Sequence, residues 1–261
     1  MTTANRLLNL LDLFTMNRPQ WTVEEAACEL GLTMSTAYRY FKSLVDAGLV
    51  ATDTPGTYTL GPAIIQFDRQ MRLLDPLITS ATPVMRRLAA AMGPSASIVL
   101  CRLYKTQVMC VHQESADRHE FISRMPPRLQ VSYGRGQLMP LHRGAPSKAI
   151  LAHMNLRLVR PIYESDPEAM RAVGLGEDWA EVRRSLRKLR STGPIVTRSE
   201  LQGGMQGIAL PVFSAQDTVI GSLSIIVPQA EESPSKETAG AALADAVRQV
   251  QATITSTAIA A

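Results

Sequence analysis

One stretch of the chain, Trp21 to Leu60, restricts most strongly what its N-terminal part can fold into. Four apolar residues at its start have the i, i+3, i+4, i+7 spacing of one helix face: Val23, Ala26, Ala27 and Leu30. Thr22, with Glu25 three residues later, is the pattern of a capping box. Gly31 can adopt the left-handed conformation that ends a helix. The stretch therefore predicts a short, sharply bounded helix over residues 23–30.

A second helix is predicted over residues 35–47, with Thr33 or Ser35 as its N-cap and Gly48 ending it. Its expected buried positions are Ala37, Phe41, Leu44 and Val45. Its opposite face carries hydroxyl groups and cations: Thr36, Tyr38, Arg39 and Lys42. Two helices joined by a glycine turn, the second with such a face, are typical of a helix-turn-helix.

A hairpin is predicted after the second helix. Leu49-Val50 and Tyr58-Thr59-Leu60 are candidate strands, and Thr54-Pro55-Gly56 between them is a turn signal. This hairpin would be the wing of a winged helix, whose second helix enters a major groove. Arginine suits guanine or phosphate, and hydroxyl groups suit phosphates or base edges. The residues expected to contact DNA are Thr33, Ser35, Thr36, Tyr38, Arg39 and Lys42.

The alternative for this stretch is an ordinary helix pair with a solvated polar face. The agreement of caps, turn, polar face and hairpin in order and spacing favours DNA binding. The charge balance is not an argument for it, because residues 1–60 hold four cations and six anions although the whole chain carries +4. DNA binding would therefore need the cations to be focused on one face.

Residues 5–16 predict a further helix, which Arg18-Pro19 ends. Gly61-Pro62 begins a linker helix with a broad apolar surface that needs a partner from the second domain or another subunit: Ile64, Ile65, Phe67, Met71 and Leu74. Asp75-Pro76 is the expected boundary. A chain of 261 residues is long enough for two domains. The predicted organisation is a DNA-binding domain at 1–61, a linker helix at 62–75 and a second domain at 76–261.

The second domain alternates helical and strand patterns. Helices are expected over 77–92, 147–153, 177–191 and from 233 onward, and strands over 96–103, 107–112, 121–125, 206–212 and 219–227. The last strand is almost entirely apolar, which predicts a central position in the sheet. The order predicts an α+β domain with an antiparallel sheet. No segment has the length of a membrane span or the pattern of a signal peptide. Three cysteines without paired spacing favour a reducing cytoplasm.

Several motifs occur together in one order. In the N-terminal part they are Ala26-Ala27, Leu30-Gly31-Leu32, Ser35-Thr36-Ala37-Tyr38-Arg39, Gly48-Leu49-Val50 and Tyr58-Thr59-Leu60-Gly61. In the second domain they are Met139-Pro140-Leu141-His142, Ser147 to Ala152, Ser199-Glu200-Leu201 and Ile208 to Val212. With these motifs, nearly the whole chain resembles the isocitrate lyase regulator (IclR) family of bacterial transcription factors.

The resemblance implies a GAF-like effector domain and a homodimer or homotetramer on palindromic operator DNA. It also implies a small-molecule effector, usually an organic acid, in an activator or a repressor. No cofactor, metal or catalytic residue is expected. By position, the pocket wall would include Met139, Leu141, His142, Arg143, Gly144, Ala145, Gly207, Ser222 and Ser224.

The sequence departs from the family pattern around this pocket. Gly207 stands where a cysteine is common, Ile226 where a serine is frequent, Arg143-Gly144 replaces a small pair, and Pro146-Ser147 replaces Leu-Gly. These changes suggest a roomier, more apolar pocket with a cation at one rim. A bulky or aromatic carboxylate would suit such a pocket better than a very small acid.

A cluster of positive charge supports an anionic effector. Between residues 118 and 160, Glu120 is opposed by eight cations: Arg118, Arg124, Arg128, Arg135, Arg143, Lys148, Arg157 and Arg160. An arginine fork matches a carboxylate with two hydrogen bonds. The alternative is a solvated basic loop, or structural pairing with distant acids.

Two other functional classes remain as alternatives. Cys110 and His112 are expected on one face of a strand, which would suit a hydrolase-like enzyme, but no third, orienting group is identifiable. Cys28 and Cys101 lie on apolar faces and are expected in the core. A ligand-independent DNA-binding protein is the other alternative, although DNA binding alone does not need so large a second domain.

Overall fold

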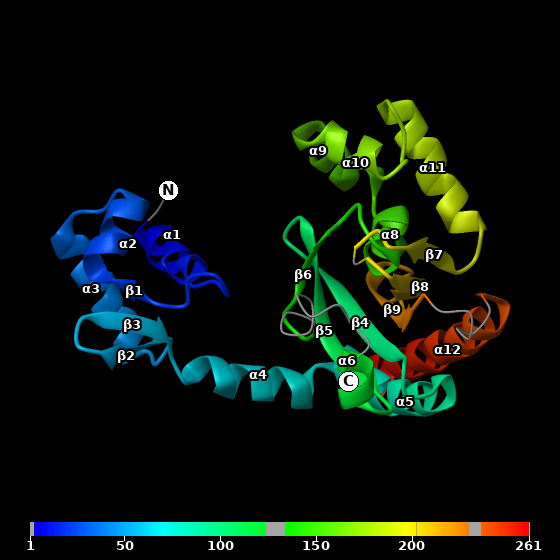
Figure 1. Ribbon diagram of the computed structural model, residues 1–261, viewed down its shortest axis with the longest axis horizontal. Helices are drawn as coiled ribbons and strands as arrows, with labels where there is room; N and C mark the ends of the chain where they lie inside the picture. The colour runs from blue at the N-terminus through cyan, green and yellow to red at the C-terminus, as the bar shows by residue number, and fades with distance from the viewer. Residues whose placement is uncertain (1–2, 124–133, 202, 230–235, 261) are drawn as a thin grey trace. The chain divides into compact units, whose positions relative to one another are not determined.

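The computed structural model describes residues 3–123, 134–201, 203–229 and 236–260 (Figure 1). The chain divides into two compact units, Met1–Asp75 (unit 1) and Pro76–Ala261 (unit 2). Among the described residues, no helix is long and apolar enough to cross a membrane.

Unit 1 is a winged helix-turn-helix followed by one more helix. Its elements are α1 (Thr3–Asn9), a 3-10 turn η1 (Leu11–Leu13), β1 (Trp21–Thr22), α2 (Val23–Leu30), α3 (Met34–Asp46), β2 (Val50–Thr54), β3 (Thr57–Leu60) and α4 (Ala63–Leu74). The antiparallel hairpin β2–β3 is the wing, and β1 adds a third strand in the order β1-β3-β2.

The capping and helix-ending signals at α2 and α3 are confirmed, but Cys28 of α2, which was expected in the core, is exposed. Thr22 and Glu25 form the capping box, and Gly31 ends α2 with φ of 62°. Thr33, not Ser35, caps α3, because its Oγ1 accepts a hydrogen bond from Thr36 N at 3.3 Å. The predicted buried face of α3 needs one correction. Tyr40 is buried and Val45 is exposed.

The predicted helix over residues 5–16 is wrong in its second half. α1 ends at Asn9, and only the short turn η1 follows. The indole Nε1–H of Trp21 donates to the carbonyl oxygen of Leu13 at 2.9 Å. The N–H groups of Leu10, Leu13 and Phe14 donate to carbonyl oxygens three residues earlier, so the chain has left the α-helical pattern before it reaches this contact.

The start of α4 depends on a glycine. A Cβ atom at Gly61 would lie 2.2 Å from the carbonyl oxygen of Gly48, so only glycine fits between the end of α3 and the start of α4. α4 buries none of its own residues within the chain. Its apolar side chains are exposed, including Ile65 at 72% and Leu74 at 74%.

Unit 2 is a six-stranded antiparallel sheet with helices on both faces. Its elements are α5 (Pro76–Met92), β4 (Ser97–Tyr104), β5 (Gln107–Ser115), α6 (Arg118–Ser123), β6 (Leu138–Pro140), α8 (Ala145–His153), α9 (Leu156–Ser165), α10 (Pro167–Ala172), α11 (Trp179–Ser191), β7 (Ile195–Arg198), β8 (Met205–Phe213), β9 (Val219–Pro228) and α12 (Lys236–Ala260). The strand order is β6-β5-β4-β9-β8-β7, so the predicted central position of β9 is confirmed.

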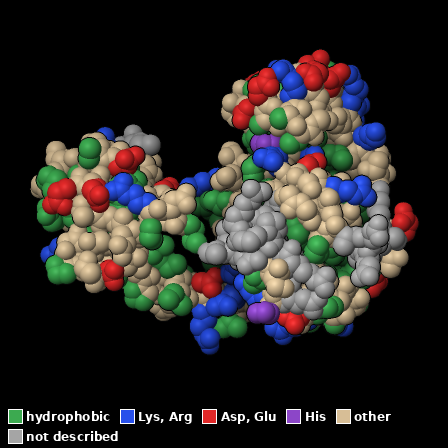
Figure 2. Space-filling view, in the orientation of Figure 1, with side chains coloured by type: hydrophobic (Ala, Val, Ile, Leu, Met, Phe, Trp, Pro, Cys, Tyr) green, Lys and Arg blue, Asp and Glu red, His purple; other side chains and the backbone are tan. Residues whose placement is uncertain are grey.

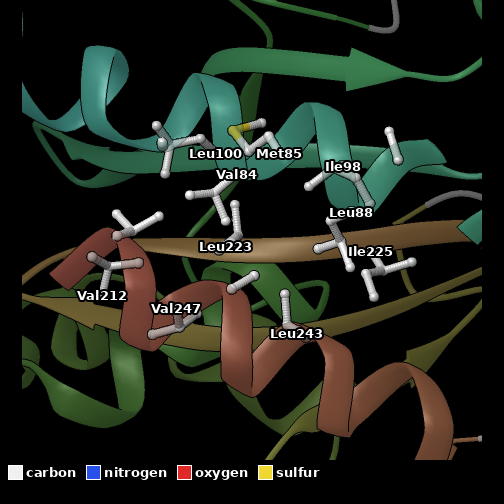
Figure 3. Packing of buried hydrophobic residues seen from close by; sticks show 14 of the residues in the cluster. Val84, Met85, Leu88, Ile98, Leu100, Val212, Leu223, Ile225, Leu243 and Val247 are labelled. Atoms are coloured by element: carbon white, nitrogen blue, oxygen red, sulfur yellow. The ribbon is translucent and has the colours of Figure 1, made fainter. Parts of the chain in front are cut away.

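Two hydrophobic cores lie on the two faces of this sheet. On one face, α5 and α12 pack over Leu223 and Ile225 of β9, as Figure 3 shows. On the other face, α8 and α11 cover a second core that includes Ile226. Successive residues of a strand point to opposite faces, so Ser222, Ser224 and Ile226 all belong to the α8 side. This is the side on which the cavity described below lies.

Some elements of unit 2 differ from the sequence prediction. The segment predicted as a strand over 121–125 contains the end of helix α6, and residues 124 and 125 lie outside the described residues. A short apolar run does not distinguish strand from helix by periodicity alone. Four further elements, β6, β7, α9 and α10, were not predicted from the sequence. The C-terminal helix begins at Lys236 in the described part of the chain, and residues 233–235 lie outside it.

Candidate functional site

The candidate DNA-contacting face lies at the start of α3. Five of the six predicted residues are exposed there, Thr33, Ser35, Tyr38, Arg39 and Lys42, and Thr36 is half-buried. The reason is the helix period, since α3 turns Ala37, Tyr40, Phe41 and Leu44 into the core of unit 1. The surface has an open hollow lined by α3 and wing residues: Tyr38, Arg39, Lys42, Val45, Thr52 and Tyr58.

An acidic side chain of α2 holds one of these residues. The hydroxyl of Tyr38 donates to Glu24 Oε1 at 3.3 Å. The charge of Glu24 raises the pKa of Tyr38, and their hydrogen bond raises it further. A solvent-exposed hydrogen bond therefore links the Tyr38 side chain of α3 to α2.

Unit 2 contains a cavity at the start of α8. The space between its lining residues is about 500 Å³ when the open solvent at its mouth is included. Its walls come from β4, β5, β6, α8, the β7–β8 hairpin and β9. The residues around it are Val99, Cys110, Gly134, Gln137, Met139, Gly144, Ala145, Pro146, Thr197, Glu200, Leu201, Met205, Gln206, Gly207 and Ile226. The cavity therefore combines apolar walls with a small group of polar atoms.

The polar end of the cavity is the N-terminus of α8. Gly144, at the N-cap position with φ of 82°, has no side chain to cap the helix. Its N–H donates instead to Glu200 Oε2 at 3.1 Å, and Ala145 N–H donates to Thr197 Oγ1 at 2.9 Å. Lys148, one turn further and buried, donates from Nζ to Glu200 Oε1 at 2.6 Å.

Four of the nine predicted pocket residues line this cavity: Met139, Gly144, Ala145 and Gly207. The other five lie elsewhere. Leu141 is buried in the core on the α8 side, and Ser222 Oγ donates to the carbonyl oxygen of Pro146 at 2.9 Å. Ser224 is fully buried with its hydroxyl unpartnered within the described residues.

His142 and Arg143 lie beside the cavity rather than in its wall. Arg143 is exposed, and its Nε and Nη2 donate to the backbone carbonyl oxygen of Glu200 at 3.1 and 2.5 Å. Burial lowers the pKa of His142, and the charges of Arg143 and Lys148 lower it further, while those of Asp166 and Glu200 act in the opposite direction. Through its two hydrogen bonds to the backbone of Glu200, Arg143 holds the β7–β8 turn.

Two of the sequence departures lie next to each other in space. A Cβ atom at Gly207 would lie 3.3 Å from Ala145 Cβ and 3.4 Å from Ile226 Cδ1. The tighter of the two contacts is with Ala145, and the Ile226 side chain borders the space that a side chain at position 207 would enter. The wall at this point is apolar, since Ala145 and Ile226 are the nearest side chains to Gly207, and the expectation of a roomier pocket stays a prediction.

The predicted cluster of cations is dispersed in the structure. Arg160 pairs with Glu164, Lys148 with Glu200, and Arg135 donates to the carbonyl oxygen of Val111. Figure 2 shows acidic and basic side chains mixed over α9, α10 and α11. Arg124 and Arg128 lie outside the described residues. Lys148 is buried and binds Glu200 at the polar end of the cavity.

The prediction that Cys110 and His112 share one face of a strand is wrong. A β-bulge shifts the register, so that Leu100 pairs with His112 but Cys101 pairs with Cys110. Cys110 faces the cavity, whereas His112 Nε2 contacts Thr82 of α5 at 3.3 Å and Glu114 at 3.0 Å. The extra residue of the bulge reverses the alternation. In the described part of the chain, no group of three or more His, Cys, Asp or Glu residues is placed to hold a metal ion.

The contacts that sequence reasoning missed come from residues distant in the chain. Thr197, Glu200 and Leu201 reach α8 from the β7–β8 hairpin, and β7 itself had not been predicted. The one available signal was the motif Ser199-Glu200-Leu201, which had been recognised without a role in the pocket.

Family models of known proteins match the sequence in both units. Residues 74–252 match the family model "Bacterial transcriptional regulator IclR C-terminal", and residues 3–54 match "IclR helix-turn-helix domain". The HTH-type transcriptional regulator KipR of Bacillus subtilis is 22% identical over 85% of this chain and 84% of its own length. The Pca regulon regulatory protein of Pseudomonas putida is 20% identical over 86% and 74%.

Solved structures share the fold at similarly low identity. A putative IclR transcriptional regulator from Silicibacter sp. has a TM-score of 0.74 at 20% identity, covering 97% of this chain and 96% of that chain. An IclR homologue from Microbacterium hydrocarbonoxydans, solved in complex with 4-hydroxybenzoate, has a TM-score of 0.70 at 19% identity, covering 97% and 99%.

Proposed function

Because the chain belongs to the IclR family of bacterial transcriptional regulators, we propose that it controls a catabolic operon in the cytoplasm in response to a small organic carboxylate. In this proposal, α3 of unit 1 binds operator DNA and the cavity of unit 2 binds the effector. The effector part of the proposal rests on the open-mouthed cavity of unit 2, which has apolar walls and one polar end at α8.

The DNA contacts are assigned to the exposed start of α3. Arg39 is placed to contact a guanine or a phosphate, and Lys42 a phosphate, while Thr33, Ser35, Thr36 and Tyr38 offer hydroxyl groups. Arg39→Ala should weaken specific operator binding by about 1–3 kcal/mol if Arg39 contacts a base. Arg183→Ala is the matched control, because Arg183 is exposed on α11 of unit 2. Equal operator affinity of the two variants, in a gel-shift titration, would reject the role of Arg39.

The protein is proposed to act as a homodimer or homotetramer on a palindromic site. The support is the exposed apolar surface of α4, which includes Ile65, Phe67 and Leu74. Contiguous apolar surface of this kind marks interaction sites. Phe67→Glu should lower the association state in sedimentation experiments, and an unchanged association state would remove α4 from the interface.

An aromatic carboxylate is proposed as the effector. Met139, Leu201, Met205 and Ile226 offer an apolar wall for a ring. Two relatives support this class, since one is named for Pca regulation and one was solved with 4-hydroxybenzoate. The effector would change the population of operator-binding conformations through its different affinity for each of them.

The first experiment is a thermal-shift panel of aliphatic and aromatic acids, each paired with its neutral amide. A ligand whose free concentration is a hundred times its dissociation constant raises the free energy of unfolding by about 2.7 kcal/mol. We expect 4-hydroxybenzoate or a similar acid to raise the melting temperature, and 4-hydroxybenzamide not to. A protein that responds only to neutral compounds would contradict the acidic effector, and operator titrations with the hit would then test regulation.

A further inference from the structure

Three hydrogen-bond donors at the cavity end of α8, two backbone N–H groups and one ammonium group, are already bound by other parts of the protein. Gly144 N–H is bound by Glu200 and Ala145 N–H by Thr197, and Pro146 has no N–H to offer. The ammonium group of Lys148, whose residue is only 6% exposed, is also bound by Glu200. A carboxylate that enters the cavity therefore finds its natural partners, the helix N-terminus and the buried cation, in contact with another carboxylate.

Glu200 is a member of the cavity wall and also the point at which the β7–β8 turn is fastened to α8. Its side chain binds Gly144 and Lys148, and its backbone carbonyl oxygen accepts from Arg143. The next residue, Leu201, lies close to Gly144. A Cβ atom added to Gly144 would be 3.3 Å from Leu201 Cβ. Ser199, just before, has φ of 53°, a conformation that non-glycine residues adopt rarely. The turn is thus held in place by the contacts of Glu200 and Arg143.

Two carboxylates cannot both use this one anion position, because like charges at short distance disfavour each other's ionised form. From this geometry we propose that Glu200 is an internal competitor of the effector: an entering carboxylate displaces the Glu200 side chain from Gly144 N–H and Lys148 Nζ and so releases the β7–β8 turn. The proposal rests on the proposed function in one respect, the acidic nature of the effector. It adds the residue that sets the affinity for acids and the segment that changes conformation.

The competition has a measurable consequence. An acid can bind only to the molecules in which Glu200 has left the site. Its apparent association constant is therefore the intrinsic one multiplied by the fraction of molecules whose site is free. Glu200→Gln keeps the shape and an acceptor for Gly144 N–H but removes the charge opposite Lys148. Because one charge-assisted hydrogen bond no longer has to be broken, this variant should bind 4-hydroxybenzoate at least about tenfold more tightly than the parent protein. Equal or weaker binding would overturn the proposal.

A second variant tests the anion position without the natural effector. Glu200→Ala leaves the Lys148 ammonium without its counter-charge in the full-length protein. We expect a lower melting temperature that sodium acetate or formate restores in a saturable way, whereas sodium chloride at equal ionic strength does not. The parent protein and the control variant Glu164→Ala should show no such response, because the Glu164 pair with Arg160 is exposed.

The outcomes separate this proposal from the function on which it rests. If the parent protein responds to 4-hydroxybenzoate but Glu200→Ala does not respond to acetate, the effector site stands and Glu200 is not its competitor. If acetate restores Glu200→Ala but the parent protein responds to no acid, Glu200 occupies an anion position and the acidic effector is rejected. If acetate stabilises Glu200→Ala and Glu164→Ala equally, the effect is general and the proposal fails.

Discussion

The N-termini of α3 and α8 both lie at a candidate binding surface, but they are capped in different ways. Thr33 caps α3 through Thr36 N–H, three residues away, and the first turn stays exposed. α8 begins at a glycine, and its first donors are bound by Glu200 and Thr197, which lie 56 and 52 residues further along the chain. A locally capped helix can meet an external phosphate without rearrangement. A helix capped from a distance cannot accept an external anion unless the distant segment moves.

This difference matches the two proposed tasks. A helix that contacts DNA benefits from a fixed geometry, since its side chains must keep their positions relative to base edges. An effector site needs two conformations that the ligand can distinguish, because a ligand with equal affinity for both shifts nothing. The long-range cap of α8 supplies such an element.

The largest effect is expected from Lys148→Met. This change removes the buried ammonium and leaves the Glu200 carboxylate, a quarter exposed, without its cation. Breaking one side of a buried ion pair costs about 3–5 kcal/mol, and the partial exposure of Glu200 places the expected loss near the lower end. Urea unfolding of unit 2 measures it, with Lys188→Met on the exposed face of α11 as the control. Similar stabilities of the two variants would show that the α8 end does not depend on the pair.

A smaller loss is expected from Thr197→Val, which keeps the shape of the side chain and removes the hydroxyl. Ala145 N–H would then be buried without an acceptor, at a cost of about 1–3 kcal/mol. Thr197→Ser, which retains the hydroxyl, should recover most of this stability. If the valine variant unfolds at the same urea concentration as the parent, the long-range cap of Ala145 is not energetically important.

At α3, Thr33→Ala should destabilise unit 1 by about 1 kcal/mol, the usual cost of losing an N-cap oxygen. Thr33→Ser should be nearly neutral. The chain has one tryptophan in each unit, Trp21 and Trp179, so fluorescence in a Trp179→Phe background follows unit 1 alone. A shift of the unit 2 transition in the matching Trp21→Phe background would contradict the local character of this cap.

The same contrast explains how much could be predicted from the sequence. The capping box of Thr22 and Glu25, the left-handed Gly31 and the turn before Thr57 all depend on residues a few positions apart, and the structure confirms them. With the family resemblance, they were enough for the winged helix and for the α+β class of unit 2.

The features that were missed depend on distant contacts. The indole of Trp21 binds the carbonyl oxygen of Leu13, in the part of the predicted first helix that is not α-helical, and the β-bulge at Val111 separates Cys110 from His112. Glu200 reaches α8 from a hairpin whose first strand is only four residues long. No periodicity or spacing in the sequence records these contacts, so the pocket was predicted by position in the family and only partly matches the cavity.

The smallest expected effect is a difference in acid sensitivity between the units. All four histidines belong to unit 2, and burial lowers the pKa of His142 and of His153 below the ordinary value of 6.5. The unfolded chain therefore takes up protons first as the pH falls, and unit 2 should lose stability from about pH 6.5 downward until the lowered pKa values are passed. In unit 1, the hydrogen bond from Thr22 N–H lowers the pKa of Glu25. The loss of unit 1 stability from protonation of Glu25 therefore begins only near pH 4.5, the ordinary pKa of a glutamate. Melting curves between these two pH values should show a change in unit 2 that His142→Gln with His153→Gln reduces, whereas earlier loss of unit 1 would contradict the assignment.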